Sequence, residues 1–351
     1  MPHPIYEKLI PALNSRGTTI LAVNCPEYFA LVEFLFTPEE AEIFYAMPHG
    51  FASAEAIASN MNNIDVQVLS GKLESMCDKG LIQSREEGGK KLYEAMPFLP
   101  GIMELQFLKG MGGERQRKVV QLFNSYRDAL RKLKKSGMPP RIEMPAAGTR
   151  LAIDKDIYNT GAIIPYEEMK ELIMNTEYIA FGICHCRNEG VVNGTSCNKP
   201  LDNCMIFGTS AKFTTERGFT KRLTKEAAIA KLDAAEEAGL IHNYTNTPDH
   251  FANFLCNCCM CHCIVIGGLP KLPAPSAAVN ARYLIRINED ECIGCEACID
   301  RCQLNAIKMV DGKLTREEKR CIGCGLCRYV CPTDALTLEP REAAKIPLKR
   351  C

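Results

Sequence analysis

The spacing of the cysteines constrains this chain of 351 residues more than any other feature. Of its 20 cysteines, 17 lie between Cys184 and Cys331. Two segments, beginning at Cys292 and Cys321, repeat the spacing C-x2-C-x2-C-x3-C. Zinc sites are built from pairs of C-x2-C, whereas triplets with a fourth member are typical of iron–sulfur cubes. The repeat therefore predicts two [4Fe–4S] clusters in the C-terminal part of the chain.

The spacing itself favours ligands that cross between two cubes. Three thiolates two residues apart on a tight loop can face one cube, whereas a fourth, expected at the start of a short helix, lies too far round and reaches the neighbouring cube. Gly294, Gly323 and Gly325 are expected to bring the backbone close to the clusters, where N–H groups tune the potential.

This double run resembles the bacterial two-cluster ferredoxin module, in which the fourth cysteine of each run ligates the other cluster. The resemblance implies two ligand sets: Cys292, Cys295, Cys298 and Cys331 for one cluster, and Cys321, Cys324, Cys327 and Cys302 for the other. Gln303 stands where a proline is usual, which we expect to loosen a turn without removing a ligand.

Composition favours a reducing compartment. Residues 1–21 contain no apolar stretch and no run of about 18 apolar residues occurs, so we expect neither a signal peptide nor a membrane span. Cysteines of such proteins more often bind metal than form disulfides, which predicts a cytoplasmic protein of an anaerobic or reducing cell. Lys and Arg total 42, as do Asp and Glu, so no overall charge points to nucleic acid or an acidic membrane.

Two Pro- and Gly-rich stretches divide the chain, at residues 136–140 and 267–275, and both are expected to be extended connections. We therefore predict a multidomain α+β protein. Its parts would be a winged-helix-like and helical domain at residues 1–137, a central α/β cysteine-rich domain at 138–268, and a 2[4Fe–4S] ferredoxin domain at 280–351.

The N-terminal pattern predicts three helices followed by a hairpin. Helices are expected after Thr37, over Ser53–Met61 and over Asp65–Lys79, and two strands at residues 81–85 and 90–94 flank a Gly-Gly turn. This arrangement over about 60 residues resembles the winged-helix regulators of the MarR and TrmB type. The resemblance implies that residues 65–79 form the recognition helix.

The charge of this helix argues against DNA as the partner. Residues 65–79 carry three acidic and two basic side chains, whereas a helix that reads a groove should be net basic. We therefore interpret the winged helix as a protein-docking or dimerisation module, through which the chain could form a homodimer. The alternative is an iron–sulfur redox-sensing winged-helix transcription regulator.

Nine central cysteines form two less standard constellations, Cys184, Cys186, Cys197 and Cys204, then Cys256, Cys258, Cys259, Cys261 and Cys263. Thiolates at this density repel one another unless metal neutralises them, so we expect one or two further iron–sulfur clusters, with structural zinc as the alternative. The first constellation could supply one complete ligand set and the second another, or the two could interleave. His185, His242 and His262 are possible ligands, but we expect each of them rather to support ligands or to pack, and we expect Arg187 to offset cluster charge.

From about Arg150 to its end, the chain resembles a family of multi-cluster ferredoxin-like proteins of strict anaerobes. The second constellation of that family often contains more cysteine, so Met260 and His262 mark departures from its pattern. The resemblance implies an electron-transfer protein or oxidoreductase subunit. Because no Rossmann fingerprint, P-loop or catalytic triad occurs, we predict a relay that passes low-potential electrons between a redox protein partner and a central metal site.

Overall fold

A computed structural model describes residues 2–16, 20–109, 113–135, 162–245 and 254–341. These residues form two compact units. The first unit contains the described residues up to 135 together with Thr209–Lys221, and the second contains the rest. The predicted boundary at residues 136–140 lies outside the described residues, so the three predicted domains stay a prediction.

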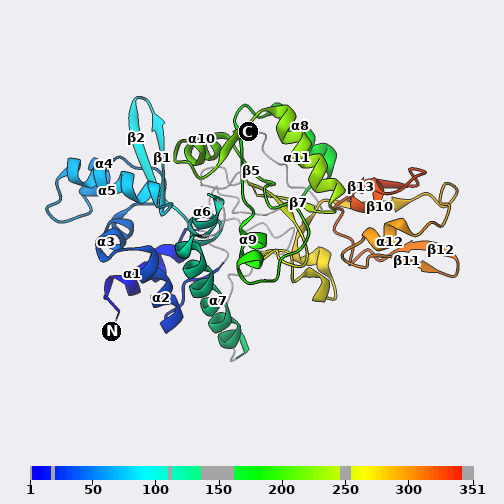
Figure 1. The fold of residues 1–351 in the computed structure, drawn as a ribbon, viewed down its shortest axis with the longest axis horizontal. Helices are drawn as coiled ribbons and strands as arrows, with labels where there is room; N and C mark the ends of the chain where they lie inside the picture. The colour runs from blue at the N-terminus through cyan, green and yellow to red at the C-terminus, as the bar shows by residue number, and fades with distance from the viewer. Residues whose placement is uncertain (1, 17–19, 110–112, 136–161, 246–253, 342–351) are drawn as a thin grey trace. The chain divides into compact units, whose positions relative to one another are not determined.

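The first unit is mainly helical (Figure 1). Its helices are α1 (Ile5–Asn14), α2 (Pro26–Leu35), α3 (Pro38–Ala46), α4 (Ala54–Ala58), α5 (Val66–Asp78), α6 (Met103–Leu108), α7 (Glu114–Lys135) and α10 (Gly208–Glu216). Strands β1 (Ile82–Glu87) and β2 (Lys90–Ala95) form its hairpin, and an irregular turn follows at Phe98–Ile102.

Local signals explain where these elements begin and end. Thr37 accepts a hydrogen bond from the backbone of Glu40, whose carboxylate accepts one in return, which is a capping box at the start of α3. Asp65 caps α5 through the backbone N–H groups of residues 67 and 68. The predicted helices and hairpin are present, with α4 shorter than expected, and the winged-helix resemblance itself stays a prediction.

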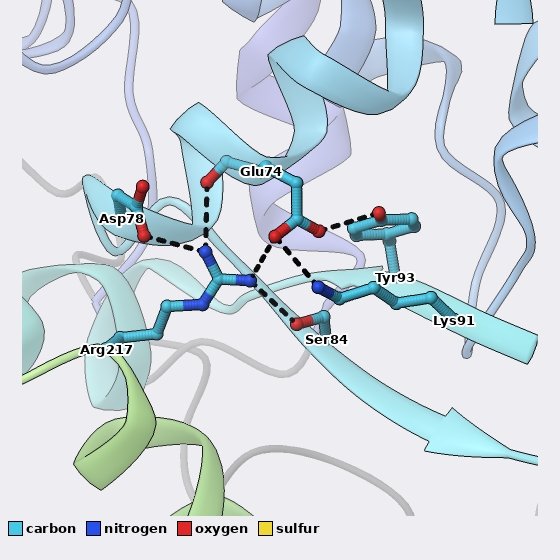
Figure 2. A network of polar contacts seen from close by, with 6 residues as sticks. All are labelled: Glu74, Asp78, Ser84, Lys91, Tyr93 and Arg217. Carbon is cyan, nitrogen blue, oxygen red and sulfur yellow. Dashed lines mark hydrogen bonds and ion pairs between the residues drawn. The ribbon is translucent and has the colours of Figure 1, made fainter. Parts of the chain in front are cut away.

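An ion-pair network ties residues 209–221 to α5 and the hairpin (Figure 2). Arg217 donates to Glu74 Oε2 at 2.6 Å and to Asp78 Oδ1 at 2.7 Å. Glu74 also accepts hydrogen bonds from Lys91 at 2.8 Å and from the Tyr93 hydroxyl at 2.7 Å. Burial opposes the charge, but these donors lower the pKa of Glu74, so its carboxylate stays ionised at the centre of the network.

The second unit contains a seven-stranded sheet in the order β6-β4-β5-β8-β7-β3-β9. The pairings β4–β5, β5–β8, β8–β7 and β7–β3 are antiparallel, and β3–β9 is parallel. Its strands are β3 (Ala162–Ile163), β4 (Ile179–Gly182), β5 (Cys204–Phe207), β6 (Lys221–Leu223), β7 (Ile241–Thr245), β8 (Phe254–Cys258) and β9 (Asn280–Ala281).

Helices α8 (Tyr166–Asn175) and α11 (Lys225–Glu237) lie beside each other against this sheet (Figure 1). Their buried side chains, among them Ile173 and Leu232, share one core with Phe207 of β5 and Leu255 of β8. Helix α9 (His185–Val192) directly follows Cys184 after β4. The core therefore fixes the ends of β4, β5 and β8, where the central cysteines occur.

The C-terminal part of the second unit has a repeated architecture. Its strands are β10 (Tyr283–Ile287), β11 (Ile307–Val310), β12 (Lys313–Arg316) and β13 (Leu336–Pro340), and its helices are α12 (Ala297–Arg301) and α13 (Leu326–Tyr329). Strand β10 pairs with β13 and β11 with β12, both antiparallel. Glu296 and Gly325, both in the left-handed region, precede the two helices.

Two local expectations were wrong. The stretch at residues 267–275 is not extended but contains the 3-10 helix Leu269–Lys271 and the start of a second one, Pro275–Ala278, because X-Pro steps there favour tight turns. The fourth cysteine of the first run does not begin a helix: Cys298 lies in α12 and Cys302 follows its end. Among the described residues, no helix is both long and apolar enough to cross a membrane.

Candidate metal centres

The first thiol group surrounds a hollow in the C-terminal part. Cys292, Cys295, Cys298 and Cys331, here called the distal set, line a hollow together with Leu314, Leu336 and other residues of the cysteine loop. Cys295 is exposed and Cys298 is buried. The four sulfurs that the ferredoxin resemblance assigned to one cluster therefore face a common space.

The second thiol group surrounds a separate hollow. Cys302, Cys321, Cys324 and Cys327, here called the proximal set, line a hollow whose walls include Ile285, Leu304 and Leu326. Cys302 arrives from the other run, as the predicted crossing of ligands requires. The assignment of each cysteine to a cluster stays a prediction, and the cavities are consistent with it.

The chemistry of these donors fits iron–sulfur clusters. Burial raises the pKa of Cys324 to about 12 and also raises the pKa of Cys298 and Cys327. Such thiols ionise only when a metal replaces the proton, because a buried thiolate without a counter-charge is costly. The backbone N–H of Ala306 lies 3.2 Å from Cys302 Sγ, the type of hydrogen bond that tunes a cluster.

One glycine has a role in addition to the one expected. Gly323 has φ +67°, and a Cβ on it would lie 2.1 Å from the backbone oxygen of Tyr283. Gly294, its equivalent in the first run, has φ +68° and would meet nothing within 4 Å. Close approach of β10 therefore requires glycine at 323, whereas at 294 only the backbone conformation favours it.

Six of the nine central cysteines form a closed ring of neighbouring thiols. Each thiol neighbours the next in the order Cys184, Cys186, Cys263, Cys258, Cys256, Cys204 and back to Cys184. The sulfurs of Cys263 and Cys258 lie 3.4 Å apart. The two constellations thus interleave, since three members come from each, and this six-cysteine ring offers more thiolates than one cube can ligate.

Positive charge and N–H donors surround the ring. Arg187, only 2% exposed, donates to the backbone oxygen of Asn257 at 2.7 Å and to the side chain of Asn203. Burial disfavours its charge, but the adjacent cysteine sulfurs raise the pKa of Arg187 above its usual value. Backbone N–H groups of Ile264 and Ile266 lie 3.4 Å from ring sulfurs. The surroundings therefore compensate anionic sulfur, as expected for Arg187.

A buried polar chain continues from the ring. His242, fully buried, lies 2.6 Å from Asn257 Oδ1 through Nδ1 and 2.8 Å from Glu236 Oε2 through Nε2. Asn257 stands between two ring cysteines and donates to the backbone oxygen of Asn203. His242 therefore supports the ring through Asn257 rather than through a sulfur, in line with its expected supporting role.

The remaining three central cysteines gather around a histidine. The donor atoms of Cys197, Cys259, Cys261 and His262 all lie within 4.8 Å of one another. Sequence reasoning counted His262 as a possible ligand but preferred a supporting role, and it did not find this grouping. The adjacency of Cys261, His262 and Cys263 was the signal, but only the fold shows that Cys197 joins them.

Gln303 is a second feature that the sequence did not explain. Its side chain accepts a hydrogen bond from the backbone N–H of Met260 at 3.2 Å and donates to the backbone oxygen of Gly239 at 2.6 Å. A proline at this position could make neither bond. Gln303 therefore joins the cysteine-rich sheet region to the C-terminal part instead of merely loosening a turn.

The fold and the paired thiol cavities define an iron–sulfur protein with a ferredoxin-like C-terminal domain. Comparison with protein families supports this class, because residues 285–338 match the family model described as 4Fe-4S dicluster domain. No curated protein and no solved structure matches the chain. The predicted dicluster domain is thereby confirmed for this segment, and a cysteine-rich site accompanies it.

Proposed function

We propose that this chain is an iron–sulfur electron-transfer protein, either free or as an oxidoreductase subunit, that relays low-potential electrons between a redox protein partner and the six-cysteine ring. The dicluster domain supplies two one-electron carriers. The ring would hold a polynuclear iron–sulfur centre as the other terminal of the relay.

The observation that carries this proposal is a continuous apolar core between the proximal set and the ring. Ring cysteines Cys258 and Cys263 are buried in the same cluster as Leu304, Ile322 and Leu326. Cys302 and Cys324 of the proximal set pack against that cluster. Because electron tunnelling weakens steeply with distance, direct packing of two ligand sets favours transfer between the metals they would hold.

The surroundings of the distal set are suited to a partner. Ile293, next to the distal set, is 66% exposed, and Cys295 is exposed as well. An accessible cluster with an apolar residue beside it is the arrangement that a transient redox complex needs. Electrons would therefore pass between the partner and the distal cluster, then to the proximal cluster and the ring.

We further propose that the first unit docks a protein or a second copy of this chain rather than DNA. The acidic side chains of Glu74 and Asp78 in α5 form ion pairs with Arg217. A helix with this charge makes a poor groove reader, since phosphate contacts dominate affinity for DNA. Redox-dependent, salt-sensitive binding to a promoter fragment in a gel shift would favour a regulator instead.

The test of the relay uses the full chain purified without oxygen. Iron and labile sulfide should exceed about eight of each per chain, the content of two cubes. After chemical reduction, EPR should show a signal from the iron–sulfur centre held by the six-cysteine ring, here called the central centre, as well as the signals of the two dicluster clusters. Cys324→Ser should abolish rapid reduction of the central centre by a reduced ferredoxin, whereas Cys25→Ser, a control outside all the sets, should leave it unchanged. Reduction of the central centre at the wild-type rate in Cys324→Ser would refute the relay.

A further inference from the structure

We propose that Cys197, Cys259, Cys261 and His262 bind a single zinc ion that clamps together the two chain segments carrying the six-cysteine ring. This site is separate from the electron relay: it would be structural, with four protein ligands and no open position. Zinc sites of the Cys3His type have this donor set.

The number and spacing of the donors suit a single ion. All four donor atoms lie within 4.8 Å of one another. Tetrahedral zinc holds thiolate sulfurs at about 2.3 Å, which places neighbouring ligand atoms about 3.8 Å apart. The group is therefore compact enough for a mononuclear site.

The orientation of His262 supports the same conclusion independently. Its Nδ1 lies 3.2 Å from Cys261 Sγ, on the side of the cysteines. Its Nε2 contacts the backbone oxygen of Thr195, and the imidazole N–H at Nε2 can donate a hydrogen bond to that oxygen. Histidines that ligate metal almost always donate their other N–H to a carbonyl or carboxylate, so Nδ1 is left to ligate.

The surrounding chain makes room for this histidine. Gly190 lies in α9, and a Cβ there would be 2.4 Å from Cδ2 and 2.6 Å from Nε2 of His262. Cys259, fully buried, packs with Leu240, and Cys197 packs against the same cluster. The imidazole and two of the thiols are therefore held in place by packing before any ion binds.

The positions of the ligands in the chain explain the clamp. Cys197 lies between ring members Cys186 and Cys204, in the connection from α9 to β5. Cys259 and Cys261 lie between ring members Cys258 and Cys263. One ion would join the only two segments that contribute ring cysteines among the described residues, and so hold the ring together.

The experiment is metal analysis and zinc X-ray absorption on the full chain, purified without oxygen. Wild type should contain one zinc per chain, with three sulfur ligands near 2.3 Å and one nitrogen near 2.0–2.1 Å. His262→Cys should keep the zinc with four sulfurs, and Cys197→Ser/His262→Ala should lose it. Absence of zinc, or zinc whose ligands are unchanged in His262→Cys, overturns the proposal. Iron content is read separately, so failure of the relay would not affect this result.

Gly190→Ala tests the site without removing a ligand. Alanine normally favours a helix over glycine, so harm at this position would come from displacing His262. We expect about 10- to 100-fold faster loss of zinc to a chelator, the usual effect of disturbing the support of a ligand. Gly268→Ala, where a Cβ meets nothing within 4 Å, is the control. Gly190→Ala in the His262→Cys background should have little effect, and equal zinc loss in both backgrounds would contradict the geometry.

Discussion

Replacing Gly323 by alanine should damage the proximal cluster, and Gly294 offers a matched control. Both glycines have nearly the same backbone conformation, φ +67° and +68°. Either substitution therefore carries the left-handed strain of an alanine, about 1–2 kcal/mol. Only at 323 would the new Cβ also meet backbone atoms of Tyr283, at 2.1, 2.5 and 2.8 Å.

That additional conflict cannot be relieved by a side-chain movement. Tyr283 begins β10, which pairs with β13 along its whole length, so its backbone oxygen can move only if the sheet shifts. Overpacking of this kind costs about 1–3 kcal/mol or more beyond the shared strain. The loop that would move instead carries Cys321 and Cys324, so the proximal set would lose its geometry.

The assay is iron and sulfide per chain after reconstitution without oxygen, together with EPR spin quantitation of the reduced protein. Gly294→Ala should keep the iron of both cubes, and Gly323→Ala should lose about four iron atoms, the content of one cube. Thermal unfolding followed by circular dichroism should show a lower midpoint for Gly323→Ala than for Gly294→Ala. Equal iron content and equal midpoints in the two variants would refute the reasoning.

Three other predictions concern contacts outside the metal centres. Arg217→Ala should destabilise the first unit by about 1–2 kcal/mol, because charged hydrogen bonds to Glu74 and Asp78 are lost. Hydrogen exchange of α5 and the hairpin measures this loss of stability, and Lys212→Ala is the exposed control. The pKa of Glu74 is lowered in the folded state, so its contribution is present above its unfolded value near 4.5 and fades as the pH falls through its lower folded value. The protection factors of the α5 amides, which correct for the intrinsic pH dependence of exchange, should therefore fall below pH 4.5 in wild type and much less in Arg217→Ala, and identical pH profiles of these protection factors would contradict this assignment. Gln303→Ala should keep full iron but slow reduction of the central centre, because the two hydrogen bonds that join the cysteine-rich sheet region to the dicluster domain disappear. An unchanged rate in rapid-mixing spectroscopy would exclude this role of Gln303.

Much of the dicluster domain could be predicted because its information is local. The two runs beginning at Cys292 and Cys321 fix ligand type, spacing and turn residues within short loops, and the family comparison agrees with that interpretation. Helices α3 and α5 of the first unit were also predictable, since Thr37 and Asp65 are caps that act on backbone three residues away or fewer.

The central site was not predictable in detail because its ligand sets depend on which strand ends meet. Cys204 begins β5 and Cys256 lies in β8, and the pairing of these strands brings the two constellations together. No spacing within either constellation encodes that pairing. The partner of Arg217 was hidden for the same reason: Glu74 lies more than a hundred residues earlier in the chain.

The division of nine central cysteines into six and three, the latter with His262, gives each group a distinct task. Electron transfer at a redox centre is fast when its ligands move little between oxidation states, because ligand movement adds to the reorganisation energy of the transfer. Without the zinc site, the two segments would be joined only by the ring sulfurs, which also have to accommodate the change in charge when the centre is reduced or oxidised. A zinc ion has no redox chemistry, so a clamp at Cys197, Cys259, Cys261 and His262 would hold the same segments in every state of the relay.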